Sequence, residues 1–356
     1  MKAFKIGDLN ISLPIIQGGM GVGVSLSGLA AAVATEGGVG VISCAGIGLY
    51  YPKLAKDYFS SCVSGLKEEL RKAREKTSGV IGVNIMVVLQ NFSDMVKTCV
   101  SEKVDIIFSG AGLPLDLPSY LQEDSVTKLV PIVSSARATK LICDKWINNY
   151  NYVPDAIVVE GPKAGGHLGY KVSQIEDNDF SLEKIIPEVV ELVKFYEQKY
   201  DRKIPVIAAG GLMTGEDIHR MLELGATAVQ MGTKFVTTTE CDASSDFKEA
   251  YLKSTKSDIE IIQSPVGLPG RAINGEFIKH VKEGTTKPKK CAFNCIKSCD
   301  YTQSAYCIVL ALYNAAKGNL KRGYAFAGAN AYLSEKISSV KETIDLLIKE
   351  YEAVKF

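Results

Sequence analysis

The chain has 356 residues, and its 41 Lys and Arg against 40 Asp and Glu give a net charge of +1 at pH 7. This length fits one large α/β domain with an appendage, or two domains. The balanced charge gives no basic face and no acidic tail, so we expect a small-molecule substrate and no nucleic-acid partner.

Apolar runs and cysteines indicate the cellular compartment of the protein. No apolar run reaches the roughly 18 residues that a membrane-spanning helix needs, and the N-terminus lacks the apolar centre of a signal peptide. The nine cysteines are an odd number, typical of free thiols in a reducing compartment. We therefore expect a cytoplasmic protein without membrane attachment, and leave open whether it forms a homodimer.

Short apolar segments alternate with amphipathic segments along the first 240 residues. The predicted strands are 14–18, 39–43, 80–86, 104–108, 128–133, 157–159, 205–209 and 226–230. The predicted helices are 26–35, 60–76, 92–101, 136–148, 182–200 and 214–224. Eight strand–helix units of this length are typical of a (β/α)8 barrel.

A doubly wound sheet is the alternative fold. Gly19-Met-Gly21-Val-Gly23 invites a dinucleotide-binding interpretation, but position 24 is Val where that fingerprint needs its third glycine. Unusual residues also follow nearly every strand, as expected where eight loops build one site. We predict an α/β fold with a (β/α)8 TIM barrel over 1–256 and a mainly helical C-terminal cap with a closing helix over 257–356.

The ends of the last two strands predict a phosphate site. Ala209-Gly210-Gly211 and Gln230-Met231-Gly232-Thr233 place bare backbone N–H groups and a hydroxyl at the barrel mouth. Barrels commonly bind phosphate between these loops. The alternative is that the glycines only make tight turns. The lysine of a nucleotide-triphosphate loop is absent.

Residues at other strand ends could bind the ring of a cofactor whose phosphate occupies this site. Their hydrogen-bonding groups suit a heteroaromatic ring with several donors and acceptors, such as a flavin. These candidates are Gly19, Met20, Asn84, Ser109, Ser135, Glu160, Gly165 and Gly166. Asn84 is otherwise a strand-end turn former, and Glu160 a loop cap. His167, one of three histidines, lies in the glycine-rich loop after 157–159 and is either an active-site group or a turn cap.

The last hundred residues are less informative. Cys291, Cys295 and Cys299 are four apart and would form one stripe on a helix. Their spacing fits neither zinc nor ferredoxin patterns. We therefore expect a buried stripe that binds no metal. The alternative hypothesis is a metal site in which these three thiols are the ligands. Residues 264–271 are expected to form an irregular loop that brings Arg271 toward the substrate or cofactor.

Six short motifs follow one another along the chain. They are Gln17-Gly-Gly-Met20, Gly82-Val-Asn-Ile-Met86, Ser109-Gly-Ala-Gly112, Ala164-Gly-Gly-His-Leu-Gly169, Ala208-Ala-Gly-Gly211 and Val229-Gln-Met-Gly-Thr233. Their order resembles that of the nitronate monooxygenases and the related FMN-dependent enoyl-acyl-carrier-protein reductases. The resemblance covers residues 10–240 and resumes at Gly318-Asn-Leu-Lys-Arg-Gly-Tyr-Ala-Phe-Ala-Gly328 and the final helix.

This resemblance implies an FMN-containing barrel. It implies phosphate on Gly210, Gly211, Gly232 and Thr233, and His167 as the base that removes a proton next to a nitro group. Nitronate oxidation by flavin and O2 is therefore expected, with NAD(P)H-dependent enoyl or quinone reduction as the alternative. A phosphate-metabolite-binding barrel without catalysis is the third hypothesis. Gly328-Ala329-Asn330 stands where relatives carry Gly-Gln, and Pro162-Lys163 replaces an apolar–acidic pair.

Overall fold

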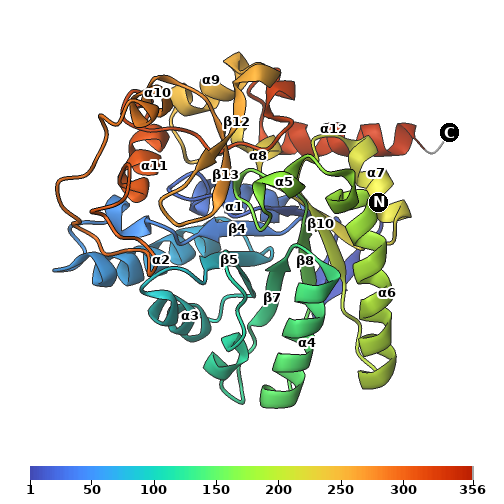
Figure 1. The fold of residues 1–356 in the computed structure, drawn as a ribbon. Helices are drawn as coiled ribbons and strands as arrows, with labels where there is room; N and C mark the ends of the chain where they lie inside the picture. The colour runs from blue at the N-terminus through green and yellow to red at the C-terminus, as the bar shows by residue number, and fades with distance from the viewer. Residues whose placement is uncertain (355–356) are drawn as a thin grey trace.

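Eight parallel strands form the centre of the computed structural model, which describes residues 1–354 (Figure 1). In spatial order they run β3, β11, β10, β8, β7, β6, β5 and β4. A parallel bridge between Ile16 and Val39 joins the two outer strands and closes the barrel. The bounds are β3 Ile15–Gln17, β4 Gly40–Ser43, β5 Ile81–Met86, β6 Ile106–Gly110, β7 Lys128–Val133, β8 Ile157–Glu160, β10 Val206–Ala209 and β11 Ala228–Met231.

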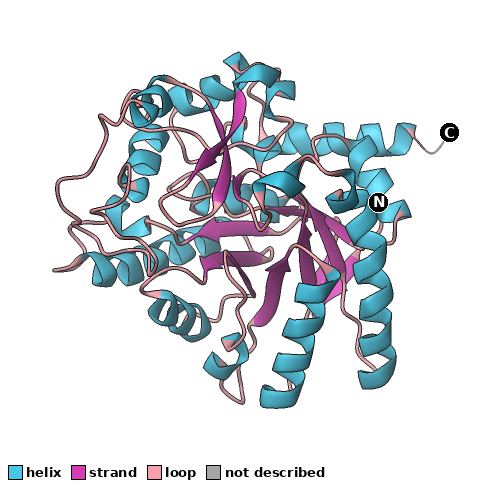
Figure 2. Ribbon diagram, viewed as in Figure 1, coloured by secondary structure: helices cyan, strands magenta, loops and turns pink. Residues whose placement is uncertain are grey.

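Helices surround these strands, because each connection between parallel strands has to cross back outside the sheet (Figure 2). The first turns of several helices are fixed by their own sequence: Asp57 accepts from Ser60 N before α2, and Thr214 and Asp217 form a capping box at α7. The barrel helices are α1 Ser27–Thr35, α2 Tyr58–Lys76, α3 Phe92–Ser101, α4 Ala136–Tyr150, α6 Leu182–Tyr200, α7 Gly215–Glu223 and the single turn α8 Thr233–Val236. These strands and helices confirm the predicted TIM barrel.

Apolar side chains fill the barrel interior and leave room at only one end. Ile16, Val41, Phe108 and Val158 belong to this interior cluster, with further residues from β7, β10 and β11. The antiparallel pair β1 (Phe4–Ile6) and β2 (Leu9–Ile11) joins the same cluster through its buried isoleucines. A site inside the barrel is therefore confined to the carboxyl ends of the strands, as in other barrels.

A cap covers that end (Figure 1). Its three-stranded antiparallel sheet has the order β12 (Ile259–Gln263), β13 (Pro269–Ile273) and β9 (Gly166–His167), so the loop after β8 is part of the cap sheet. The cap helices are α5 Val172–Ile175, α9 Ser245–Lys253, α10 Glu276–Lys282 and α11 Ile308–Ala316. Helix α12 (Val340–Ala353) returns to the barrel and packs on α7 and α1.

The C-terminal extension is mainly helical, as predicted, because α10, α11 and α12 hold more residues than its strands do. It also contains the hairpin β12–β13, which was not predicted, and residues 283–307 are largely irregular. Residues 355 and 356 of the predicted extension lie outside the described part of the chain. Within residues 1–354, no helix combines the length and apolar character needed to cross a bilayer.

Candidate active site

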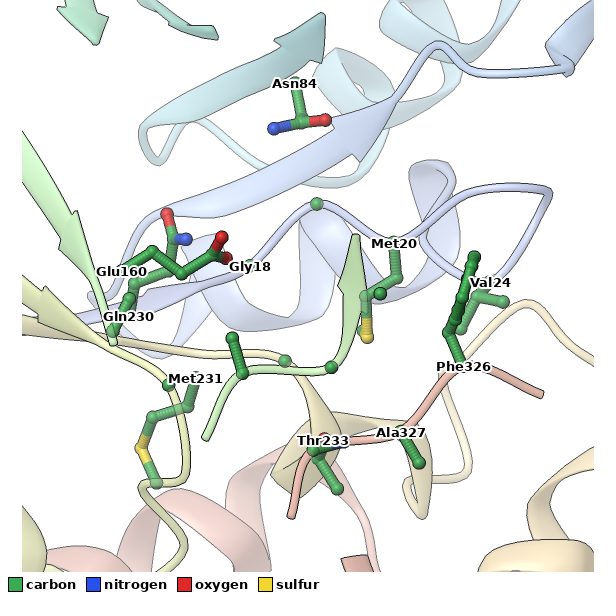
Figure 3. A pocket seen from close by; sticks show the side chains of 18 of the residues that line it. Gly18, Met20, Val24, Asn84, Glu160, Gln230, Met231, Thr233, Phe326 and Ala327 are labelled. Carbon is green, nitrogen blue, oxygen red and sulfur yellow. Dashed lines mark hydrogen bonds between the residues drawn. The ribbon is translucent and has the colours of Figure 1, made fainter. Parts of the chain in front are cut away.

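A cavity of about 230 Å³ opens at the carboxyl ends of the strands (Figure 3). It collects residues from β5, β8, β10 and β11, from the loop after β3, and from the segment 326–330. Most of the predicted site residues line it together: Gly19, Met20, Asn84, Glu160, Gly165, Gly166, His167, Gly210, Gly211, Gln230, Met231, Gly232 and Thr233. Sequence positions more than 200 residues apart thus meet at one mouth.

One side of this cavity is made of bare backbone. Gly210 and Gly211 have φ angles of +104° and +79°, which residues with a Cβ rarely adopt. Within residues 1–354, no group accepts a hydrogen bond from the N–H of Gly211 or Gly232. Two partly buried donors and the Thr233 hydroxyl therefore remain for an anionic ligand, which is the composition of a phosphate site.

The C-terminal segment completes this cradle. Asn330 donates from Nδ2 to the Gly211 carbonyl at 2.7 Å, and Gly328 N donates to Thr233 Oγ1 at 3.0 Å. Residues 328–330, which depart from the pattern of the resembled family, thus hold both glycine loops in place. The Thr233 hydroxyl keeps its own proton for a ligand, because it accepts from Gly328.

Three polar side chains line the cavity from three different strands. Asn84, Glu160 and Gln230 come from β5, β8 and β11 (Figure 3). Within the described chain, no residue makes a hydrogen bond with any of their side-chain amide or carboxyl groups. Burial raises the pKa of the Glu160 carboxyl to about 7. A ligand with several donors and acceptors would satisfy these groups, because unpaired polar atoms in such a place are costly.

His167 lies at the junction of barrel and cap. It pairs with Gly270 in the cap sheet, its Nε2 lies 2.8 Å from Ser264 Oγ, and its ring meets Phe326 edge to face at 5.0 Å between centroids. Burial lowers the pKa of the imidazole to about 4, so the ring is neutral at pH 7. A neutral imidazole has a lone pair with which it can accept a proton.

Arg271 has a different role from the one expected. The residue lies in strand β13 and not in an irregular loop, and it is buried. Its Nη1 donates to the carbonyls of Pro162 and Ala164, at 2.6 and 2.8 Å. The guanidinium therefore braces the glycine-rich loop in front of His167, and it is absent from the cavity lining.

Ser109 and Ser135 do not reach the cavity, contrary to expectation. Ser109 pairs with Ile85 across β5 and β6, and its hydroxyl donates to the Ile85 carbonyl at 3.0 Å. Its neighbour Phe108 takes the inward position beside Asn84, because successive strand residues point to opposite faces. Ser135 is the N-cap of α4, where its side chain accepts from Ala138 N.

The predicted cysteine stripe is also wrong as a helix. Cys291, Cys295 and Cys299 lie in the irregular part of the cap, with Cys291 exposed. Across the part of the chain that the structure describes, no three His, Cys, Asp or Glu side chains are arranged to hold a metal ion. The geometry therefore does not support these thiols as metal ligands.

The family model described as nitronate monooxygenase matches residues 2–98 and 88–350. The chain belongs to the nitronate monooxygenase family. A probable nitronate monooxygenase of Staphylococcus haemolyticus is 28% identical over 320 residues, which cover 79% of this chain and 81% of that protein.

Two solved structures share the fold of this chain. FabK from Thermotoga maritima aligns with a TM-score of 0.74 and 29% identity, over 97% of this chain and 94% of that one. A nitroalkane oxidase from Streptomyces ansochromogenes shares the fold, with a TM-score of 0.73 at 20% identity over 96% of each chain. As a member of the nitronate monooxygenase family, the chain is an oxidoreductase.

Sequence reasoning missed several residues that shape this family member's site. Gln17 is fully buried, and its Oε1 accepts from Val41 N at 2.9 Å, which ties the end of β3 to β4. Ser264, Phe326 and Asn330 also act there through the contacts described above. Gln17 is a polar residue at the end of a buried strand, a signal that was visible in the sequence. Ser264 had no such signal, because its role depends on the cap sheet.

Proposed function

We propose that the mouth of the barrel binds flavin mononucleotide. Backbone donors at Gly211 and Gly232 and the Thr233 hydroxyl fit its phosphate, with Gly210 shaping the turn. The unpaired groups of Asn84, Glu160 and Gln230 fit the polar edges of its ring, beside Gly19, Met20, Gly165, Gly166 and Met231. When bound, this cofactor accepts electrons from a substrate and passes them on. The remaining chemistry depends on what the chain's own side chains do.

We propose further that the chain catalyses oxidation of nitronates and nitroalkanes, with His167 as general base. The imidazole removes the proton on the carbon next to the nitro group, and the bond's electron pair moves into the nitro group to form the nitronate. With Nε2 at Ser264, the tautomer protonated at Nε2 leaves the Nδ1 lone pair for this proton. The observation that carries the proposal is a neutral, partly buried imidazole at the same mouth as the bare backbone cradle.

An anaerobic visible spectrum of the purified protein tests this function. The expected result is a flavin spectrum that bleaches when a nitronate is added and recovers when O2 is admitted. Flavin bands that do not respond to any nitronate would overturn the proposed activity. A protein that stays colourless after incubation with flavin mononucleotide would favour a phosphate-metabolite-binding barrel without redox chemistry.

Reduction with NAD(P)H as the electron donor is the second candidate. The observation in its favour is the 29% identity to FabK over nearly the whole of both chains. In this case His167 would protonate or orient an enoyl or quinone substrate and would not act as a base. Bleaching of the flavin by NADH under argon, with no response to nitronate, would favour this second activity.

A further inference from the structure

A second cavity, of about 510 Å³, lies within the cap and is bounded by strand β12 and helix α10. Residues 298–306 and Tyr324 complete its wall. Among residues 1–354, none lines both this cap cavity and the cavity at the barrel mouth. The cap cavity is therefore a separate site, and a ligand that occupies it does not enter the barrel.

The inner wall of the cap cavity is apolar. The rings of Phe277, Tyr306 and Tyr324 contact one another, with centroids 5.5 to 6.0 Å apart. Further inner side chains are aliphatic, and they belong to Ile261, Ile262, Ile278 and Val281. Aromatic and aliphatic side chains together form the usual lining of a site for an apolar small molecule.

The buried hydroxyls of this wall are already paired. Those of Tyr306 and Tyr324 bond to each other at 3.1 Å, and Ser304 donates to a backbone carbonyl at 2.7 Å. The Ser264 hydroxyl pairs with His167. The interior therefore does not require a hydrogen-bonding ligand, because an apolar molecule leaves none of these groups unsatisfied.

The size and the rim of the cap cavity define the class of ligand. An apolar cavity of about 150 Å³ takes up one benzene molecule, so about 510 Å³ has room for two or three rings. Within the described chain, Lys282 is the one lysine or arginine of the lining, and Glu260 pairs with it at 3.0 Å. A carboxylate such as a fatty acid would find no free cation there. The cavity fits an uncharged compound of two or three rings.

One side chain of the cap cavity reaches His167 directly. Ser264 lines the cavity, and its Oγ lies 2.8 Å from His167 Nε2. The serine begins the turn 264–267, in which Gly267 N donates to the Ser264 carbonyl at 3.0 Å. The turn has room to move, because Gly267 is exposed and no atom lies within 4 Å of the position of a Cβ there. A ligand packed against this turn can displace the serine hydroxyl, and with it the imidazole.

We propose that the cap cavity is an effector site, in which an uncharged compound of two or three rings binds and alters the hydrogen bond between Ser264 and His167. The inference goes beyond the proposed function, since binding in the cap involves neither a flavin nor a nitronate. The ligand acts by preferring one arrangement of the turn 264–267 over another, which is the only way in which binding shifts such an equilibrium.

Calorimetry with 2-naphthol, an uncharged two-ring probe, tests the site on protein incubated with flavin mononucleotide. The intact protein should bind one molecule. Val281→Trp places a ring in the cavity and should raise the Kd about tenfold or more, because the ligand loses its contacts there. Ile262→Trp is a second filling variant, in case the first perturbs α10. Leu141→Trp, at an exposed position on α4, is the matched control and should leave the Kd unchanged. No binding to the intact protein, or full binding in both filling variants, would overturn the site.

The imidazole ¹⁵N resonances test the coupling to His167. They report which ring nitrogen carries the proton, and the chain has only three histidines to assign. Addition of 2-naphthol should move the His167 resonances with the Kd found by calorimetry, whereas those of His219 on α7 should not respond. Ser264→Ala should keep binding and lose the response of His167.

Two results would overturn the effector role. One is binding of 2-naphthol with unchanged His167 resonances, and the other is a response that persists in Ser264→Ala. Neither measurement depends on turnover, so failure of the proposed oxidation of nitronates would be seen separately in the anaerobic spectrum.

Discussion

The Nε2 atom of His167 lies 2.8 Å from Oγ of Ser264, a residue 97 positions further along the chain. The two meet because β9 pairs with β13, and the turn at 264–267 connects β13 back to β12. The hydrogen bond joins the barrel's glycine-rich loop to the cap. It also fixes the orientation of the one imidazole in the proposed active site.

Ser264→Ala tests this orienting role. We expect kcat on a neutral nitroalkane to fall by about fivefold, because loss of one hydrogen bond of about 1 kcal/mol leaves the ring less well held. Turnover of the preformed nitronate should change much less, since it needs no proton removed. Ser257→Ala, on the exposed surface, is the control. An equal loss on both substrates would show that Ser264 only supports the local fold.

The His167→Ala variant should still bind flavin but should lack the general base. Turnover of a neutral nitroalkane is expected to drop by roughly 10²–10⁴-fold, the usual contribution of general base catalysis. Turnover of the preformed nitronate should change much less, because it needs no proton removed. Flavin content is measured from the visible spectrum and rates from O2 consumption. If both substrates suffer alike, proton abstraction is not the function of this residue.

Glu160→Gln should change how stability depends on pH. The carboxyl has a pKa of about 7 in the folded chain against an ordinary value of 4.5, so the folded state binds more protons between these values. Its contribution to stability is therefore complete below pH 4.5 and is lost as the pH rises through 7. The flavin-free wild type should lose about 2.5 kcal/mol of unfolding free energy relative to the variant between pH 5 and 8. Urea unfolding at each pH measures this, and a constant difference would contradict it.

Gly211→Ala combined with Thr233→Val should weaken cofactor retention. A Cβ at position 211 would lie 2.6 Å from Lys163 Cβ, at a φ of +79°, so the cradle has to distort. We expect flavin affinity to fall at least tenfold, as measured by fluorescence titration, because the hydroxyl donor is lost as well. Gly284→Ala, at a φ of +75° with open space around it, is the control for backbone strain alone. Unchanged affinity in the double variant would remove the phosphate assignment.

Arg271→Met should destabilise the loop before His167. The carbonyls of Pro162 and Ala164 would lose their shared charged donor, and leaving buried acceptors unpaired costs about 2 kcal/mol or more. We expect a lower thermal midpoint and a reduced rate on nitroalkane and nitronate alike. Arg137→Met removes an exposed guanidinium and should have little effect. A normal thermal midpoint with selective loss of substrate binding would instead indicate that Arg271 contacts the substrate directly.

The sequence by itself determined the barrel and the position of its site. Each buried strand, its following helix and the glycines at its end are local patterns, so 157–159 and 205–209 were recognisable without knowledge of their neighbours. Because all carboxyl ends of a barrel meet at one mouth, Gly211, Gly232 and His167 were expected together, and the structure brings them to one cavity.

Only the tertiary structure decided which polar side chains face that cavity and what lies behind them. Ser109 was predicted to line it, yet the strand register turns it away and leaves Phe108 beside Asn84. Ser264 and Arg271 acquire roles through pairing of β13 with β9, a contact between distant segments that no local pattern encodes. A shift of one residue in a strand exchanges its two faces, so such roles depend on the folded register and not on residue type.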